Sequence, residues 1–342
     1  MKIRNFCLLL VALVAFASCS SDENEELIGN WKTLGSFDGA ARSDATGFVI
    51  GDTAYICLGY NRKSEALSDL WRYNPSDKTW KPRASFPGAA RYAASSFVVN
   101  GKAYVGLGFD GIVPLKDFWE YDPKTDTWTQ VAEVFPGEAR YFAVAEGVGG
   151  VGVVGTGFDY GDNYKDFFKF TPGTGAGSGT WQPISSYEGA KRQGACTFVI
   201  GNYMYLLGGS SNESNPSDMQ RYNPSSNQWE KVLDLMNTDL TSLDDKYGNI
   251  PRAFACAFVM NGKGYITLGT KGNSHTNTTY EYDPVANLFL ERTPFTRSAR
   301  SGAVAFSLQN RGFIMTGKTG TTRFDDFFEF FPNEANNQYD DY

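Results

Sequence analysis

The sequence is poor in the residues that build metal centres and nucleophilic sites. Its 342 residues include a single histidine, His275, and five cysteines, of which Cys7 and Cys19 lie near the N-terminus. Metal centres gather several His, Cys or carboxylate ligands, and a Ser/His/Asp set needs a histidine beside its nucleophile. The sequence contains neither pattern, and it has no glycine-rich phosphate loop ahead of a helix. We therefore expect no metal site and no cofactor.

Three cysteines remain beyond the N-terminal region, Cys57, Cys196 and Cys256. An odd number argues against a complete disulfide framework, so we expect them to be small buried residues. Basic charge is also scarce, with 31 Lys and Arg against 38 Asp and Glu; without Lys2 and Arg4 the balance is 29 minus 38, or −9. Nucleic-acid binding needs a basic surface, which excludes nucleic acid as a partner.

The only apolar run of any length is "CLLLVALVAF", which follows Lys2 and Arg4 and precedes "ASC" at Cys19. This pattern indicates an export signal over residues 1–18. "FASC" resembles a bacterial lipoprotein signal, which implies lipidation of Cys19, and a plain secretory signal is the alternative. The acidic stretch over 19–28 resembles the tether of surface-exposed Bacteroidetes lipoproteins. We expect an exported protein held at the outer membrane by this anchor alone, facing the cell surface or the periplasm.

Six copies of one pattern make up most of the chain. Each copy opens with an arginine ahead of a small, apolar stretch, as in "ARYAASSFVV" at Arg91. The six arginines are Arg42, Arg91, Arg140, Arg192, Arg252 and Arg300, at spacings of 49, 49, 52, 60 and 48 residues. A glycine follows 17 residues after every arginine, and a Pro turn and a bulky aromatic residue come later in the copy. Repeats of this length are typical of propellers and other repeat architectures.

Each copy is predicted to form four short strands, with the Pro turn between the third and the fourth. The sixth copy ends in "EFFPNEANNQYDDY" without a closing Trp strand, whereas "NWKTLGSFDGAARS" places Trp31 ahead of the first arginine. We predict an all-β, six-bladed β-propeller with four antiparallel strands per blade, closed by the N-terminal strand around Trp31, because closure removes an exposed sheet edge. The predicted propeller covers residues 29–332, and a polar tail covers 333–342.

These repeats resemble the Kelch family of β-propellers, which is related to the galactose oxidase propeller. The resemblance extends over roughly Gly29 to Pro332. The double glycine of the family remains only at Gly208 and Gly209, and the other copies have Leu or Thr at the first position. The copper site of galactose oxidase needs two histidines, so the resemblance implies the fold without the copper chemistry.

The repeated arginines have predicted partners at the start of the third strand, at the same end of each blade. Five copies carry an aspartate there: Asp69, Asp117, Asp166, Asp218 and Asp326. Because a partly buried charge needs a partner, we predict that most arginines stabilise the fold by pairing with an aspartate of their own or the neighbouring blade. In the fifth copy Thr278 replaces the aspartate. Arg252 is therefore predicted to be freer and to bind an anionic group, such as a carboxylate.

A second set of candidate ligand contacts lies beside the arginines and in the loops after the glycines. Tyr92, Tyr141 and Gln193 directly follow their arginines. The loops add Phe109, Phe158, Asp159 and Tyr160, and the loop of the fifth copy adds His275. Aromatic faces beside polar groups suit a sugar. The alternatives are that the rings pack between blades and that His275 is an ordinary exposed loop residue.

Two functions follow as hypotheses. The first is a non-catalytic, lipid-anchored propeller that binds a glycan or a surface protein through its loop face. The second comes from the resemblance to exported six-bladed Kelch propellers that are sialic acid mutarotases. Sugar ring opening needs a group for proton transfer and a cation for the acid group, roles that Arg252 with Asp159 or Glu188 could fill.

Overall fold

The structure is a computed structural model that describes residues 27–212, 214–236 and 247–341. Cys19, the predicted signal and most of the predicted tether lie outside these ranges. No helix in the described ranges is both long enough and apolar enough to cross a membrane.

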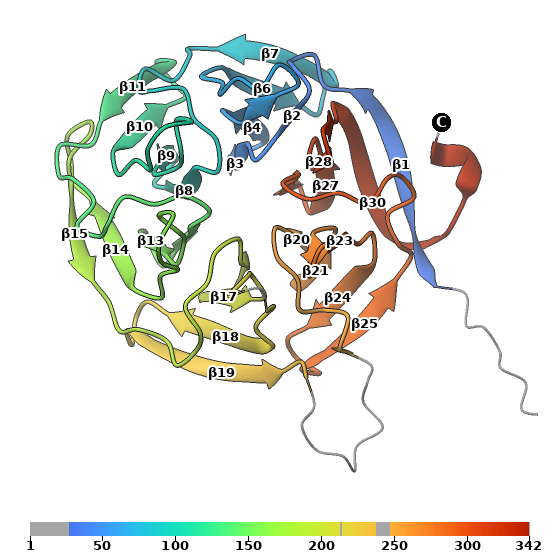
Figure 1. The fold of residues 1–342 in the computed structure, drawn as a ribbon. Helices are drawn as coiled ribbons and strands as arrows, with labels where there is room; N and C mark the ends of the chain where they lie inside the picture. Colours follow the sequence, from blue (N-terminus) through green and yellow to red (C-terminus); the bar gives the residue numbers. More distant parts are fainter. Residues whose placement is uncertain (1–26, 213, 237–246, 342) are drawn as a thin grey trace, which may run out of the picture.

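Six four-stranded antiparallel sheets are arranged as blades around a central axis (Figure 1), which confirms the six-bladed β-propeller. From the axis outward, blade 1 consists of β3 (Thr46–Ile50), β4 (Thr53–Cys57), β6 (Leu70–Asn74) and β7 (Thr79–Arg83). Blade 2 consists of β8 (Ser95–Val99), β9 (Lys102–Gly106), β10 (Phe118–Asp122) and β11 (Thr127–Gln130). Blade 3 consists of β12 (Val144–Val148), β13 (Val151–Gly155), β14 (Phe167–Pro172) and β15 (Gly179–Pro183). Blade 4 consists of β16 (Cys196–Ile200), β17 (Tyr203–Leu207), β18 (Asp218–Asn223) and β19 (Gln228–Asp234). Blade 5 consists of β20 (Cys256–Met260), β21 (Lys263–Thr267), β24 (Thr279–Asp283) and β25 (Leu288–Arg292).

The sixth blade joins the two ends of the chain, as predicted. It consists of β26 (Val304–Leu308), β27 (Arg311–Met315), β30 (Asp326–Ala335) and β1 (Ile28–Ser36). Trp31 lies opposite Phe330 in the β1–β30 pair and is fully buried. The last strand runs past the predicted boundary at 332, because Ile28 pairs with Ala335. The predicted tail also forms the short 3₁₀ helix η2 (Gln338–Asp341), and Asn30 donates to Asp340 at 2.8 Å.

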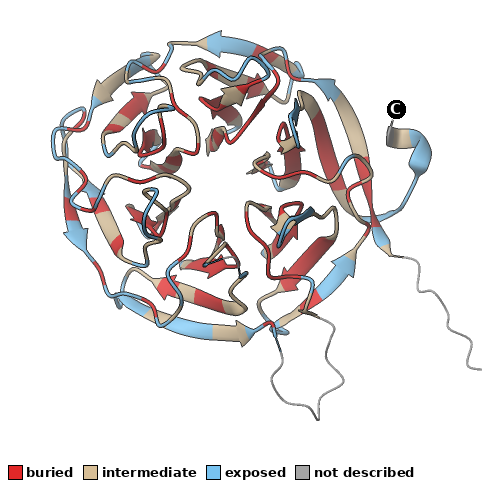
Figure 2. Cartoon of the chain, viewed as in Figure 1, coloured by how far each residue is buried: buried red, intermediate tan, exposed pale blue. Residues whose placement is uncertain are grey.

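The hydrophobic core lies between neighbouring blades, and Figure 2 shows the buried residues along their strands. Both faces of an inner strand pack against a neighbour, so β9 has four consecutive buried residues. In five blades the first two strands carry a stacked aromatic pair, such as Phe97 and Tyr104 with ring centroids 5.0 Å apart. The three described cysteines are buried and free, as predicted.

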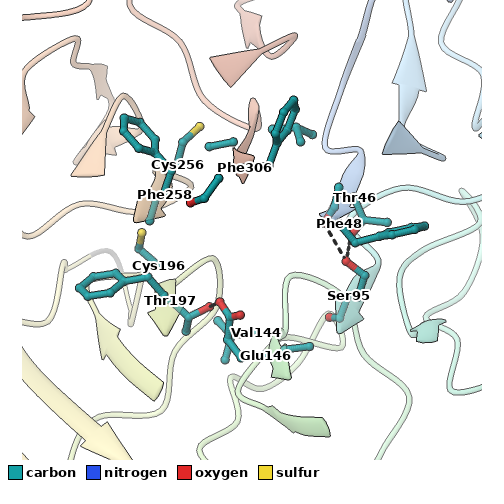
Figure 3. A pocket seen from close by; sticks show the side chains of 18 of the residues that line it. Thr46, Phe48, Ser95, Val144, Glu146, Cys196, Thr197, Cys256, Phe258 and Phe306 are labelled. Carbon is teal, nitrogen blue, oxygen red and sulfur yellow. Dashed lines mark hydrogen bonds between the residues drawn. The ribbon is translucent and has the colours of Figure 1, made fainter. Parts of the chain in front are cut away.

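The innermost strands surround a channel of about 500 Å³ along the axis (Figure 3). Glu146 of blade 3 lines it and occupies the position that phenylalanine has in the five other blades. Its Oε1 accepts a hydrogen bond of 2.9 Å from Thr197 Oγ1. Burial raises the pKa of Glu146 to about 7, while the hydrogen bond from Thr197 acts in the opposite direction.

Candidate functional site

The six repeated arginines form a buried layer beneath the loops. The Arg91 guanidinium donates to Asp117 at 2.6 and 2.9 Å, and to the carbonyl oxygens of Ala89 and Leu107. Burial acts to raise the pKa of Asp117, but the hydrogen bonds and charge of Arg91 outweigh it and lower that pKa. The four equivalent pairs are Arg42–Asp69, Arg140–Asp166, Arg192–Asp218 and Arg300–Asp326. Every pair lies within one blade, so these arginines stabilise the fold.

Arg252 lacks the aspartate of the other copies, as the sequence shows, but the prediction that it is therefore freer to bind an anionic group is wrong. Its side chain is 1% exposed, and its five N–H groups all donate. The acceptors are the Thr278 hydroxyl at 2.8 Å and the carbonyl oxygens of Asn249, Ile250, Leu268 and Thr278 at 2.5 to 3.2 Å. Backbone oxygens have thus replaced the missing carboxylate, which leaves no donor for a ligand. Burial lowers the pKa of Arg252 to about 10.

A ring of backbone hydrogen bonds surrounds the axis at the loop end of the innermost strands. It joins the residues two positions after each arginine: Asp44, Ala93, Phe142, Gly194, Phe254 and Gly302. Each N–H donates to the carbonyl of the preceding member around the axis, at 2.7 to 3.3 Å, and all six have a positive φ. Non-glycine residues adopt this conformation only at a cost in strain. The strained Phe142 and Phe254 meet above the channel, with ring centroids 4.8 Å apart.

A hollow of about 410 Å³ lies on the loop face beside this ring, and we call it the Lys318 hollow. Its lining includes Asp44, Phe142, Phe254, His275, Ser301 and Lys318. Lys318 Nζ donates to Asp44 Oδ2 at 2.8 Å, and Ser43 Oγ donates to the same oxygen at 2.8 Å. His275 Nε2 lies 3.2 Å from Ser301 Oγ. Burial and then the charge of Lys318 lower the pKa of His275, which keeps the imidazole neutral at pH 7.

A second hollow of about 590 Å³ adjoins the first, and we call it the amide hollow. Side-chain amides dominate its lining: Asn163, Gln193, Asn212, Asn215 and Asn273. Phe158 and Phe254 supply aromatic walls. The structure therefore places the predicted contacts Gln193 and Phe158 in one hollow and His275 in the other.

The remaining aromatic candidates form a cluster over blades 2 and 3. Ring centroids lie 5.4 Å apart for Tyr92 and Phe109, 5.2 Å for Phe109 and Tyr141, and 5.8 Å for Tyr141 and Tyr160. Phe109 is only 6% exposed, so the prediction that it contacts a ligand is wrong and the packing alternative holds. Tyr160 is 56% exposed. Tyr92 and Tyr141 are half-buried between these extremes.

The predicted acidic groups lie apart from both hollows. Asp159 Oδ1 accepts hydrogen bonds from the backbone N–H groups of Gly161 and Asp162, and its Oδ2 accepts one from the Tyr164 hydroxyl. Asp159 is therefore used to shape its own loop, which corrects its predicted role at a ligand. Glu188 is exposed and does not line either hollow.

Sequence reasoning missed Lys318 and Asp44, although the repeat contains a signal for both. Lys318 directly follows the repeated glycine, the position that Phe109 and Phe158 occupy in their copies. Asp44 lies two positions after its arginine, where the other copies have Ala, Gly or Phe. Both are charged residues at the loop end of a blade, at positions where the residue type varies between the copies. This combination could have identified them as candidate ligand contacts. Within the described ranges, no group of three or more His, Cys, Asp or Glu side chains could hold a metal ion.

Comparison with known protein families finds a match for three of the six blades. A model of the Kelch motif matches residues 41–87, 90–134 and 191–236, which are blades 1, 2 and 4. The chain contains Kelch repeats. The solved structure of YjhT superposes on this propeller with a TM-score of 0.70 at 18% identity, covering 86% of this chain and 95% of that chain. At that identity the similarity shows a shared fold.

Curated relatives match shorter segments of the Kelch propeller. An N-acetylneuraminate epimerase of Vibrio cholerae serotype O1 is 43% identical over 60 residues, which are 15% of this chain and 15% of that protein. An N-acetylneuraminate epimerase of Shigella sonnei is 32% identical over 98 residues, or 27% of this chain and 23% of that protein. The chain thus spans less than a quarter of the length of the curated relatives that it matches.

Proposed function

We propose that the loop face binds an acidic sugar of the N-acetylneuraminate class and catalyses the exchange of its two anomers. The observation that carries this proposal is the composition of the Lys318 hollow, where an ammonium group, an imidazole, a carboxylate and two phenylalanine rings share one cavity. The names of the curated relatives support the same substrate class. Lys318, and not the buried Arg252, supplies the cation.

Lys318, His275 and the two phenylalanine rings each have a role in the proposed reaction, and Asp44 positions the Lys318 ammonium by accepting its hydrogen bond. The Lys318 ammonium binds the sugar carboxylate, and Phe142 and Phe254 contact the apolar C–H face of the ring. His275, which is neutral at pH 7, accepts the proton of the anomeric hydroxyl while the bond between the anomeric carbon and the ring oxygen breaks. The ring oxygen takes up a proton from solvent, and a ketone forms at the anomeric carbon. Reclosure on the other face of that ketone returns the proton and gives the second anomer.

Binding without turnover is the second candidate, and a different observation favours it. Ile112 and Tyr160 are 80% and 56% exposed on the same loop face, outside the Lys318 hollow. Exposed apolar and aromatic side chains of this kind suit a larger glycan or a surface protein. In this case the Lys318 hollow would hold the acidic sugar but leave the ratio of its anomers unchanged.

NMR spectroscopy separates the two candidates. Freshly dissolved β-anomer of N-acetylneuraminic acid is followed with and without the protein, and binding is measured on the equilibrated sugar. We expect faster anomer exchange, a roughly tenfold loss of affinity in Lys318→Met and a loss of rate of about 100-fold or more in His275→Asn. Since the pKa of His275 is lowered, the rate should be constant at neutral pH and fall only in acid.

Lys271→Met is the matched control, because Lys271 donates to Gly248 and Asn249 on the same face and does not line the Lys318 hollow. It should leave affinity and rate unchanged. Binding without faster exchange would support the second candidate. Absence of binding, or equal affinity in Lys318→Met and the parent protein, would contradict both assignments of this hollow.

A further inference from the structure

The Lys318 hollow and the amide hollow adjoin each other on the loop face, and we call the two together the cavity. They share four lining residues: Phe254, Thr270, Gly272 and Asn273. Their volumes of about 410 and 590 Å³ each fall in the range of small-molecule sites. Because the hollows share one edge, a ligand of two linked units bound there would place one unit in each hollow.

The chemistry changes between the two hollows. The Lys318 hollow contains Lys318, Asp44 and His275, whereas no charged side chain among the described residues lines the amide hollow. A side-chain amide offers both donors and an acceptor, as a sugar hydroxyl requires. The amide hollow thus suits a neutral, hydroxyl-rich group, and its described lining residues offer no cation to a second carboxylate.

The Gln193 side chain of the amide hollow is available to a ligand. The Gln193 side chain makes no hydrogen bond to any residue that the structure describes, although it lines the cavity. Asn163 Oδ1 is buried and also lacks a partner within the described ranges. Asn163 Oδ1 has almost no exposed surface, so the Gln193 amide is the group that a ligand hydroxyl reaches. The rings of Phe158 and Phe254 add apolar walls for the C–H face of a sugar.

We propose that the cavity takes a disaccharide, with a free acidic sugar in the Lys318 hollow and a neutral sugar in the amide hollow. This inference rests on the proposed function, which assigns the acidic sugar and its anomeric carbon to the Lys318 hollow. The neutral sugar is then linked through a hydroxyl other than the anomeric one. Such a disaccharide arises when hydrolysis cleaves an internal glycosidic bond of a longer glycan at the anomeric carbon of its acidic sugar.

Isothermal titration calorimetry with three probes tests the proposal. The probes are N-acetylneuraminic acid, a disaccharide with galactose linked to O4 of N-acetylneuraminic acid, and α2,8-linked disialic acid. We expect the galactosyl disaccharide to bind roughly tenfold tighter than the monosaccharide, as one or two added hydrogen bonds allow. Disialic acid should gain nothing, because its second carboxylate meets no cation among the described residues that line the amide hollow.

Two glutamine variants localise the gain. Gln193→Ala should weaken binding of the galactosyl disaccharide at least threefold and leave the monosaccharide unchanged, whereas Gln228→Ala, at an exposed position on β19, should change neither. Equal affinity for the disaccharide and the monosaccharide, or no effect of Gln193→Ala, would overturn the inference. Failure of the proposed function would give a different result. In that case the monosaccharide itself would not bind, or its affinity would not depend on Lys318.

Discussion

Blades 2 and 5 hold the same repeated arginine in two different ways. Arg91 of blade 2 forms a two-point ion pair with Asp117, whose side chain is 26% exposed. Arg252 of blade 5 donates to one hydroxyl and four carbonyl oxygens and contacts no carboxylate among the described residues. Both guanidinium groups are buried; Arg91 donates four hydrogen bonds within the fold and Arg252 donates five.

The difference shows that hydrogen bonds and charge are separate requirements for a buried cation. Neutral oxygens satisfy every N–H group of Arg252 but do not balance its charge, and burial accordingly lowers its pKa to about 10. In blade 2 the Asp117 carboxylate both accepts hydrogen bonds from the guanidinium group and balances its charge. When one copy of a repeat lacks a partner residue, other groups of the fold can take its place. The missing residue alone therefore does not indicate a ligand site.

The largest expected effect comes from removing the two guanidinium groups while keeping their aliphatic stems. Arg91→Met leaves the partly buried Asp117 without its cation and should lower the free energy of unfolding by about 3 kcal/mol. Arg252→Met leaves only neutral oxygens without donors, so we expect a loss of about 2 kcal/mol. Chemical denaturation at pH 7 measures both. A larger loss in Arg252→Met than in Arg91→Met would contradict this account of the two blades.

Blade 3 offers a second exception, at the position where Glu146 replaces phenylalanine. Since the pKa of Glu146 is raised in the folded protein, from its ordinary 4.5 to about 7, stability is lost as the pH rises through this interval. Glu146→Gln removes this titration. We expect the variant to gain on the order of 2 kcal/mol relative to the parent protein between pH 5 and pH 8, as channel water reduces the full effect.

Unfolding curves across this pH range test the prediction for Glu146. Glu138→Gln, at an exposed position of the same repeat, serves as the control and should run parallel to the parent protein. Parallel curves for Glu146→Gln would show that water in the channel solvates the carboxylate fully.

The substitution with the smallest expected effect gives blade 5 the aspartate that blade 2 has. Thr278→Asp supplies the absent carboxylate beside Arg252 and should stabilise the protein by about 1 kcal/mol at pH 7. The gain should vanish in acid, when the new carboxyl group becomes protonated. Thr278→Asn is the matched control without charge. A similar gain in both variants, measured by chemical denaturation, would mean that charge does not limit the stability of blade 5.

The fold could be predicted from the sequence because its information is local and repeated. The aspartates that follow four of the arginines at a spacing of 26, and one at a spacing of 27, correspond to the observed ion pairs. Trp31 identified the closing strand because the sixth copy lacked one. Tyr160 was selected as an aromatic residue of a loop and Gln193 as the residue after its arginine; Tyr160 is exposed and Gln193 is half-buried, and their contact with a ligand stays a prediction.

The Lys318 hollow could not be predicted in the same way. Lys318 and Asp44 are separated by 274 residues, and only closure of the ring brings them to a distance of 2.8 Å. Phe142 and Phe254 meet over the channel because the backbone of both is held in a left-handed conformation. Neither relation has a counterpart in residue spacing.

The sequence by itself determined the number of blades, the order of their strands and the closing strand, because each follows from a pattern that recurs within about 50 residues. The tertiary structure decided which polar groups are left for a ligand. Arg252 is the clearest case, since the backbone carbonyls of Asn249, Ile250 and Leu268 satisfy it. Every residue has a carbonyl, so only the path of the chain decides where these oxygens point.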